Sequence, residues 1–394
     1  MVNETIKVEK KKLVKILILT ALAGMIVFGI LFTVFCKITG RILISSEEYS
    51  AMNKISSRYE KLYILQEKMN SEGYFKVSED KQMDAVYKGL VKSLKDPYSE
   101  YFTAKEAKTW NDYVNGTFYG IGVVFGKSKN GEFLISEVIE KSPAENSGIK
   151  KYDVIMRVDG KTYKTSEELR KAIMGKAGTK VKLTVKRDKS LRDVKIIRGK
   201  VTEKTVKGII GKNNVGYIRI SSFAEKTADE FKTELAYMEK KNVKGVVIDL
   251  RDNGGGYAQQ GVKIADMLLP EGTIMYIKDN KGKKSYFNSK PGATKLKYVL
   301  LINGNTASTA EILTAAVKDN KGGKIVGTVT YGKGIMQAEF PFKDGSALKL
   351  TTNQYFSPKG HQIHKKGISP DYEVKLTKED KTDTQLERAL KLIN

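Results

Sequence analysis

The stretch YVLLINGNTASTAEILTAAV (298–317) joins an apolar run, a turn of small and hydroxyl residues, and a run with helical spacing. The first run predicts a buried strand and the last a helix, with Ser308 at the turn between them. Ala307 and Ala310 are small, so the Ser308 hydroxyl should be accessible, and a helix N-terminus favours developing negative charge. The pattern fits a nucleophile or an ordinary helix N-cap, because serine is common in both roles.

A serine nucleophile needs a base to take its proton. The two histidines, His361 and His364, lie together in one later loop, so lysine is the leading candidate. Lys333, in TVTYGKGIMQ (328–337), lies between two glycines, with no acidic residue from 325 to 338. A lysine acts as a base only when uncharged, so desolvation must lower its pKa from about 10.4. Gln337 is expected to hydrogen-bond the amine, although a lysine between glycines also suits a plain loop.

The stretch DLRDNGGGY (249–257) follows another apolar run and contains three successive glycines. Glycine allows backbone angles that direct N–H groups into a site, and an oxyanion hole needs such donors. We expect the N–H groups of Gly254, Gly255 and Thr309 to form the hole. A simple turn is the alternative for the glycines.

Outward from these motifs, strand-like and helix-like runs alternate from about residue 204, which predicts a layered sheet with helical crossovers. Residues 116–190 read as a small β-rich module with one helical stretch, and residues 46–95 carry helical spacings. The helical region fits a stalk or a pairing element, so a homo-oligomer is left open. The fold class predicted is a multidomain α+β and α/β chain with an N-terminal transmembrane helix.

Residues 16–36 form an uncharged stretch of 21 residues that is long enough to span a membrane as a helix. Five lysines precede it and two basic residues follow it, so the basic N-terminus, 1–15, should remain cytoplasmic and the catalytic part should lie outside the cytoplasm. A cleaved signal peptide is the rival interpretation, but no small-x-small cleavage site lies near its end. The predicted location is the cell membrane, through a single-pass anchor.

The composition excludes several classes of function. The formal charge of +25 is spread along the chain, which suits anionic surroundings but not a nucleic-acid module. A single cysteine, Cys36, allows no internal disulfide, and two histidines are too few for a zinc site. No cofactor, no metal and no nucleic-acid partner are expected.

The stretch YGIGVVF (119–125) offers glycine-flanked N–H groups before a strand, as a loop that captures a terminal carboxylate does. The following EVIEKSPAENSGIKKYDVIMRVDGKTY (137–163) resembles the PDZ domain pattern. The resemblance implies that Tyr119, Gly120, Ile121 and Gly122 bind the C-terminus of a protein or peptide substrate. A β-module that only packs is the alternative.

Taken together, these motifs resemble the carboxyl-terminal processing peptidases, or tail-specific proteases. Ser308 and Lys333 are 25 residues apart and Gln337 follows four residues later, as in the family pattern, while Glu311 and Thr330 also fall at family positions. The resemblance, over about residues 75–375, implies a membrane-anchored serine endopeptidase that cleaves proteins near their C-termini through an acyl-enzyme on Ser308. Lys333 would be the base and then the acid.

The resemblance also implies the division of the chain. We predict a helical segment at 46–110, a PDZ domain at 115–195 that gates activity, a protease core at 200–375 and a C-terminal helix or tail at 376–394. The chain departs from many members in having Met174 where they carry an arginine. Two alternatives remain, a catalytically silent PDZ-bearing membrane scaffold and a hydrolase that uses His361 or His364.

Overall fold

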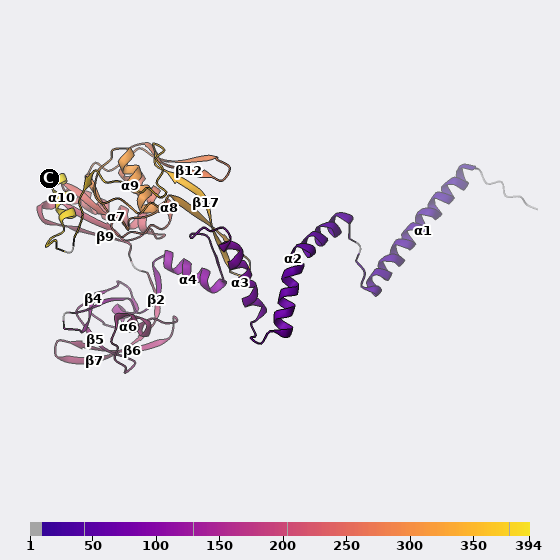
Figure 1. Ribbon diagram of the computed structural model, residues 1–394, viewed down its shortest axis with the longest axis horizontal. Helices are drawn as coiled ribbons and strands as arrows, with labels where there is room; N and C mark the ends of the chain where they lie inside the picture. The colour runs from indigo at the N-terminus through magenta and orange to yellow at the C-terminus, as the bar shows by residue number, and fades with distance from the viewer. Residues whose placement is uncertain (1–9, 43, 129, 203, 378) are drawn as a thin grey trace, which may run out of the picture. The chain divides into compact units, whose positions relative to one another are not determined.

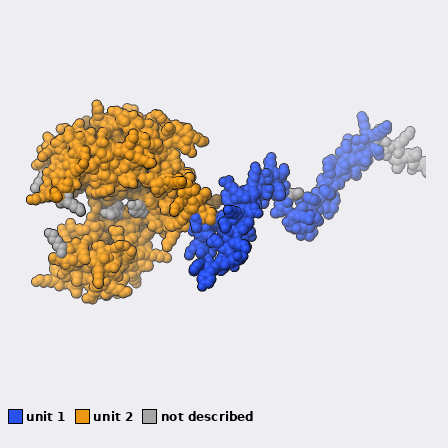
Figure 2. Space-filling view, viewed as in Figure 1, with its two compact units in different colours: residues 1–85 blue, residues 86–394 orange. Residues whose placement is uncertain are grey.

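The computed structural model describes residues 10–42, 44–128, 130–202, 204–377 and 379–394. The chain divides into two compact units, residues 1–85 and 86–394 (Figures 1 and 2), with the boundary inside helix α3 (Glu79–Lys92). The predicted helical segment 46–110 therefore includes parts of both units. The prediction for residues 1–9 lies outside the described residues.

The first unit is helical. Helix α1 (Lys10–Thr39) is long and apolar enough to cross a membrane. Helix α2 (Ser46–Glu72) begins after Ser45, which forms a capping box with Glu48, because each side chain bonds the backbone N–H of the other residue. Within this unit, α2 contacts the start of α3 through a hydrogen bond from Gln82 Nε2 to Asn70 Oδ1 of 2.8 Å.

The predicted PDZ module is an antiparallel sheet with the order β3-β4-β5-β6-β7. A separate strand pair, β2 and β8, flanks it in sequence, and apolar residues of the sheet and of helix α6, such as Ile135, Leu169 and Leu183, form its own core. The elements are β2 (Thr117–Gly120), β3 (Val123–Lys127), β4 (Phe133–Val138), α5 (Pro143–Asn146), β5 (Val154–Val158), α6 (Ser166–Ile173), β6 (Lys180–Arg187), β7 (Ser190–Ile197) and β8 (Gly199–Thr202).

The predicted core contains a six-stranded sheet with the order β18-β15-β14-β11-β10-β9, in which only β9 runs antiparallel to its neighbour. Its elements are β9 (Val206–Ile210), a 3-10 turn (Lys212–Asn214), β10 (Gly216–Ile220), α7 (Thr227–Lys240), β11 (Gly245–Asp249), α8 (Ala258–Leu268), β14 (Lys297–Ile302), α9 (Thr309–Asp319), β15 (Lys324–Gly327), β18 (Tyr372–Glu373) and α10 (Thr384–Ile393).

Both faces of this sheet are covered, as alternate residues of its strands show. Ile248 of β11 packs with residues of α7, α8 and α9, whereas its neighbour Val247 packs with Ala389 and Ile393 of α10. Successive side chains of a strand point to opposite faces, so the near-continuous apolar runs in the sequence reflect burial on two sides.

A second sheet of five strands lies in the same unit: β1 (Glu100–Phe102), β12 (Gly272–Asp279), β13 (Lys284–Ser289), β16 (Ile335–Pro341) and β17 (Ala347–Phe356). Helix α4 (Ala104–Val114) follows β1 and leads toward β2. The sequence patterns did not predict this sheet, because its strands are mostly half-buried and alternate weakly. The predicted multidomain mixture of α and β structure is confirmed.

Candidate active site

Three loops that carry predicted site residues leave the carboxyl ends of three adjacent parallel strands, β15, β14 and β11. The loop after β11 contains Gly254 and Gly255, the loop after β14 contains Ser308, and the loop after β15 contains Lys333. In open α/β sheets, ligands commonly bind beyond the carboxyl ends of the strands. The topology therefore gathers segments that are up to about 80 residues apart in the sequence.

Ser308 occupies a strained turn at the start of α9, with φ of 56° and ψ of −119°. A positive φ is uncommon for a residue other than glycine, and such strain often marks a functional site. The Ser308 N–H donates to Glu311 Oε2 at 2.9 Å, and the N–H of the preceding Ala307 donates to the Asn253 carbonyl at 2.9 Å. These bonds fix the turn from both sides and leave the Ser308 side chain half-buried.

Glu311 connects the serine turn to the lysine loop. Its carboxylate is fully buried and accepts, besides the Ser308 N–H, the Thr330 hydroxyl at 2.6 Å, the Gly332 N–H at 2.7 Å and the Lys333 N–H at 2.8 Å. A buried carboxylate is stable only when such donors satisfy it. One side chain therefore fixes the backbones of both Ser308 and Lys333.

The Lys333 amine lies over the Tyr98 ring, with 4.7 Å between Nζ and the ring centroid. Burial lowers the pKa of Lys333, as does the positive charge of Lys349, while the carboxylates of Asp96 and Glu311 act in the opposite direction. The net shift is downward from 10.5. Within the described part of the chain, no hydrogen bond joins Lys333 Nζ to Ser308 Oγ.

Tyr355, which no sequence pattern identified, contacts the loop that carries Lys333. It is buried, and its hydroxyl donates to the Lys333 carbonyl. Burial and the Glu311 charge raise the pKa of Tyr355 well above its usual value, while a hydrogen bond with the Ser308 side chain lowers it. Gln337 lies on β16 and donates its side-chain amide to Thr351 at 3.0 Å; no bond to the Lys333 amine is found among the described residues.

The glycine loop lies directly against the serine turn. A Cβ on Gly255, which has φ of +97°, would lie 2.7 Å from Ser308 Cβ and 2.9 Å from the Thr309 nitrogen. The Gly255 N–H donates to Asn253 Oδ1 at 2.8 Å, so it is engaged in this conformation. Across the described ranges no hydrogen bond engages the N–H groups of Gly254 and Thr309, which leaves two of the three predicted donors open for an oxyanion.

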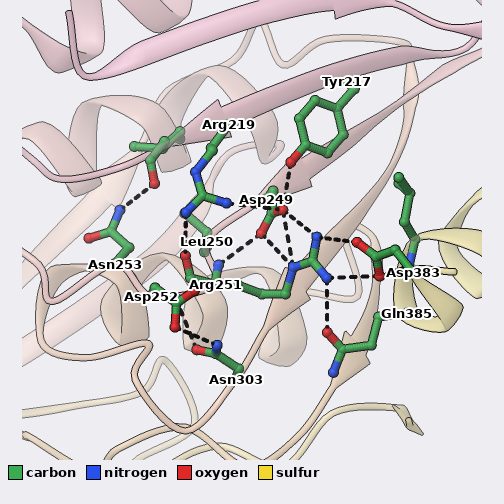
Figure 3. Close-up of polar contacts among 12 residues, drawn as sticks. Tyr217, Arg219, Asp249, Leu250, Arg251, Asp252, Asn253, Asn303, Asp383 and Gln385 are labelled. Atoms are coloured by element: carbon green, nitrogen blue, oxygen red, sulfur yellow. Dashed lines mark hydrogen bonds and ion pairs between the residues drawn. The ribbon is translucent and has the colours of Figure 1, made fainter. Parts of the chain in front are cut away.

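Figure 3 shows how the loop after β11 is anchored. The Arg251 guanidinium contacts the buried Asp249 at 2.6 Å, Asp383 at 2.8 Å and Gln385 at 3.1 Å, which ties the loop to the start of α10. Asp252 Oδ1 accepts the side-chain amide of Asn303 at 2.8 Å. Since Asn303 begins the loop that carries the serine, this bond sets the spacing between the glycine and serine loops.

Of the predicted peptide-binding residues, Tyr119 and Gly120 form the end of β2, and Ile121 and Gly122 connect it to β3. The Tyr119 carbonyl accepts the Gly175 N–H at 3.3 Å, and the Ile121 carbonyl accepts the Ala144 N–H at 2.7 Å. In the described chain no hydrogen bond engages the N–H groups of Ile121 and Gly122. Strand β3 is an edge strand of its sheet, which is the position at which an extended peptide can add to a sheet.

The histidines do not form a hydrolytic centre with the nearby serine. His361 Nδ1 lies 3.4 Å from Asp319 and 3.3 Å from the buried Ser357 hydroxyl, so both partners face the same ring nitrogen. A serine-histidine-aspartate triad needs them on opposite nitrogens. The backbone of His364 instead packs against Gly334, where a Cβ would lie 2.3 Å from the His364 nitrogen.

Comparison with known proteins identifies the relatives of this site. Residues 214–374 match Peptidase family S41, and residues 120–197 match the PDZ domain. A probable CtpA-like serine protease of Staphylococcus haemolyticus is 38% identical over 344 residues, which cover 86% of this chain and 67% of the relative. The chain belongs to peptidase family S41. Another S41 relative, a probable CtpA-like serine protease of Staphylococcus epidermidis, is 35% identical over 361 residues, or 90% of this chain and 73% of the relative.

This S41 chain also shares its fold with the photosystem II D1 C-terminal processing protease, with a TM-score of 0.51 and 24% identity over 89% of this chain and 98% of that one. The chain is therefore a CtpA-like serine peptidase with a PDZ domain, as the resemblance in the sequence implied. At Met174, the departure from many S41 members, the C-terminal end of α6 is held by Arg198, which donates to the carbonyls of Ala172 and Ile173 at 2.7 and 2.8 Å.

Proposed function

We propose that this S41 peptidase is a membrane-anchored endopeptidase that cleaves proteins near their C-termini with Ser308 as nucleophile and Lys333 as base. The observation that carries the proposal is the buried Glu311 carboxylate, which binds the backbone N–H groups of both residues. A nucleophile and its base must be positioned within hydrogen-bonding reach, and a shared buried acceptor supplies that positioning. The strained Ser308 turn supports the same assignment.

In the proposed reaction, the Lys333 amine takes the proton of Ser308 Oγ as the oxygen attacks the scissile carbonyl carbon. The N–H groups of Gly254 and Thr309 stabilise the tetrahedral oxyanion. Lys333 then gives its proton to the departing amine, which leaves an acyl-enzyme on Ser308. Water hydrolyses the ester with Lys333 again as the base, so the active site returns to its starting state.

This mechanism requires the Lys333 side chain to leave the Tyr98 ring. A cation–π contact favours the charged amine, and it contributes about 0.5–2 kcal/mol depending on exposure. Burial already favours the uncharged form. The cost of the movement is therefore modest, and an arriving substrate that excludes water would favour the uncharged, catalytic conformer. Gln337 is proposed to orient the amine after this movement.

Action near C-termini is supported by the PDZ domain and by the shared fold with the photosystem II D1 C-terminal processing protease. Gating by the PDZ domain is supported by the ion pairs that join it to the core. Lys204–Glu140 and Lys207–Glu137 have contact distances of 3.2 and 2.7 Å, and all four side chains are at least 45% exposed. Exposed ion pairs contribute only about 0–1 kcal/mol each, so the PDZ domain can separate from the core at little cost.

The membrane anchor is proposed to be α1, with the peptidase part outside the cytoplasm. The length and apolar character of the helix support this placement, as does the lysine cluster at its N-terminal end. The lysines of the PDZ domain and the protease core then face anionic lipid headgroups or wall polymers. A cleaved signal peptide would instead release the domains, and the mass of the mature chain distinguishes the two outcomes.

The test is digestion of casein by the full chain in detergent micelles, with Ser308→Ala and Lys333→Ala as variants. Both variants should lose cleavage while keeping the parent's circular dichroism spectrum. Lys343→Ala, an exposed lysine in the same part of the chain, is the matched control and should cut normally. Equal cleavage by all four proteins would rule out Ser308 and Lys333 as the catalytic dyad. If the parent cleaves no peptide near its C-terminus, the catalytically silent scaffold is favoured.

A further inference from the structure

Lys349, on β17, is a cation in an unusually enclosed position. Its Nζ lies 4.0 Å from the centroid of the Trp110 ring and 4.9 Å from that of Phe102. The side chain is only 12% exposed, and Glu100 lies 3.5 Å from the amine. Aromatic faces and one carboxylate therefore stabilise a charge that has lost most of its water.

Trp110, on helix α4, is fixed in turn by two contacts. Its indole N–H donates to Glu339 Oε1 on β16 at 2.6 Å, and its ring stacks on Phe102 with 5.6 Å between centroids and 19° between planes. Glu339 pairs directly with Lys349 in the β16–β17 ladder. The Trp110 ring thus has little freedom to move, and it determines where the Lys349 amine lies.

Strand β1 connects the enclosed amine to the surroundings of the proposed base. Lys349 pairs with Glu100 in the β1–β17 ladder, and Tyr98, whose ring lies under the Lys333 amine, precedes Glu100 by two residues. Strand β16 begins two residues after Lys333 and pairs with β17 along its length, so the ladder that carries Lys349 also fixes the Lys333 loop. The charge of Lys349 is one of the influences that favour the uncharged form of Lys333. Two like charges close together disfavour each other.

We propose that Lys349, held by Trp110 and Glu100, is a positioning residue that places a fixed positive charge beside the proposed catalytic base, Lys333. The inference rests on the proposed function, because it assigns a role only if Lys333 is the base. Lys349 takes no proton and touches no reacting atom. Its contribution is the electrostatic field at Lys333, which depends on charge at this position rather than on the length of the side chain.

Other charged groups around Lys333 change its pKa in different directions. Asp96 acts on it with the opposite sign, since a carboxylate favours the charged amine. Asp96 is held by the Ser99 hydroxyl at 2.5 Å and by the Tyr98 N–H at 3.0 Å. Among the described residues, other charged or titratable groups lie near the lysine loop or face Lys349. They are Tyr98, Tyr331, Tyr355, His364, Lys365, Lys366, Glu311, Glu100 and Glu339.

The test is the pH profile of kcat/KM for a C-terminal peptide, measured on the full chain in detergent micelles. Activity rises with pH as Lys333 loses its proton, so the midpoint of this rise reports its pKa. Lys349→Met should move the midpoint upward by about half a pH unit to one unit, and Lys349→Arg should leave it in place. Below the midpoint, a one-unit shift lowers activity about tenfold. Asp96→Asn should move the midpoint downward.

The opposite directions distinguish electrostatics from damage to the fold, because loosening of the site would move both variants alike. Trp110→Phe keeps an aromatic ring but loses the indole donor, so it should move the midpoint upward by less than Lys349→Met. Trp110 is the only tryptophan, and its emission spectrum in each Lys349 variant checks the local packing.

Two kinds of failure are separable. If the parent's activity depends on Ser308 and Lys333 but Lys349→Met leaves the midpoint unchanged, the inference is wrong and the proposed function stands. A shift of the same size in Lys349→Arg also overturns the inference, because the charge is then not what matters. If the parent's activity survives loss of Ser308, the proposed function itself fails.

Discussion

Replacing Glu311 by glutamine is expected to disable the peptidase and destabilise it. The Glu311 carboxylate accepts four hydrogen bonds, two on each oxygen, and it is fully buried. A glutamine amide keeps one acceptor oxygen and places an NH2 group where the other oxygen was. The NH2 group then faces either the Ser308 and Lys333 N–H groups or the donors from Thr330 and Gly332.

The magnitude follows from those contacts. A hydrogen bond to a charged group contributes about 1.5–3 kcal/mol, so the loss of two gives about 3–6 kcal/mol. This is a large share of the 5–15 kcal/mol that typically stabilises a protein. Because the lost bonds hold the backbones of nucleophile and base, kcat/KM should fall by at least about a hundredfold even at temperatures where the variant is folded.

Urea denaturation followed by circular dichroism measures the stability, and hydrolysis of a C-terminal peptide at low temperature measures kcat/KM. Glu239→Gln is the matched control. Within the described chain, the side chain of this exposed glutamate accepts a single hydrogen bond, from the Thr294 hydroxyl, so the change should alter neither quantity appreciably. If Glu311→Gln keeps the parent's stability and kcat/KM, the carboxylate does not position the two catalytic backbones and the reasoning fails.

Three further outcomes are expected. Gly255→Ala would place a Cβ 2.7 Å from the Cβ of Ser308 and should lower kcat/KM at least about a hundredfold. A Cβ on Gly254 would meet no atom within 4 Å, so Gly254→Ala should lower kcat/KM far less. Similar losses in the two variants would contradict the loop geometry. Arg251→Met leaves its aspartate partner buried and should lower the unfolding free energy by about 3–5 kcal/mol in urea; an unchanged midpoint would argue against this anchor. Burial raises the pKa of Asp153, but its hydrogen bonds with Arg187 lower it, and the net shift is downward from the usual pKa of 3.8. The stability that this carboxylate contributes is therefore fully present above pH 3.8 and is lost as the pH falls through the lowered pKa. Asp153→Asn should therefore flatten the acid side of the PDZ domain's stability curve, measured by denaturation between pH 2 and 5.

The strongly periodic segments of the chain were predictable from sequence. The apolar runs of β11 and β14 and the helical spacing of α9 identified the sheet and the turn that holds Ser308. The PDZ module was identified from its motifs, and the membership of the peptidase family is confirmed. The roles of Ser308 and Lys333 remain predictions, because no hydrogen bond between their side chains is found among the described residues.

What sequence patterns could not provide is the environment of Lys333. The local sequence contains no acid near the lysine, yet Asp96, more than 200 residues away, acts on it, and Tyr98 lies beneath its amine. Lys349 and Tyr355 come from a strand whose weak alternation gave no clear signal. The pKa of a buried amine depends on groups that only the fold brings together, so local composition could predict the direction of desolvation but not the balance of charges.

The most direct test of the account is the site and rate of modification by a fluorophosphonate, which reacts with activated serines. The full chain is labelled at several pH values, digested and examined by mass spectrometry, in parallel with Lys333→Met. We expect that the peptide containing Ser308 carries the label, that the rate rises with pH, and that the lysine variant reacts at least about a hundredfold more slowly. Label on a different residue, or equal rates in parent and variant, would contradict it.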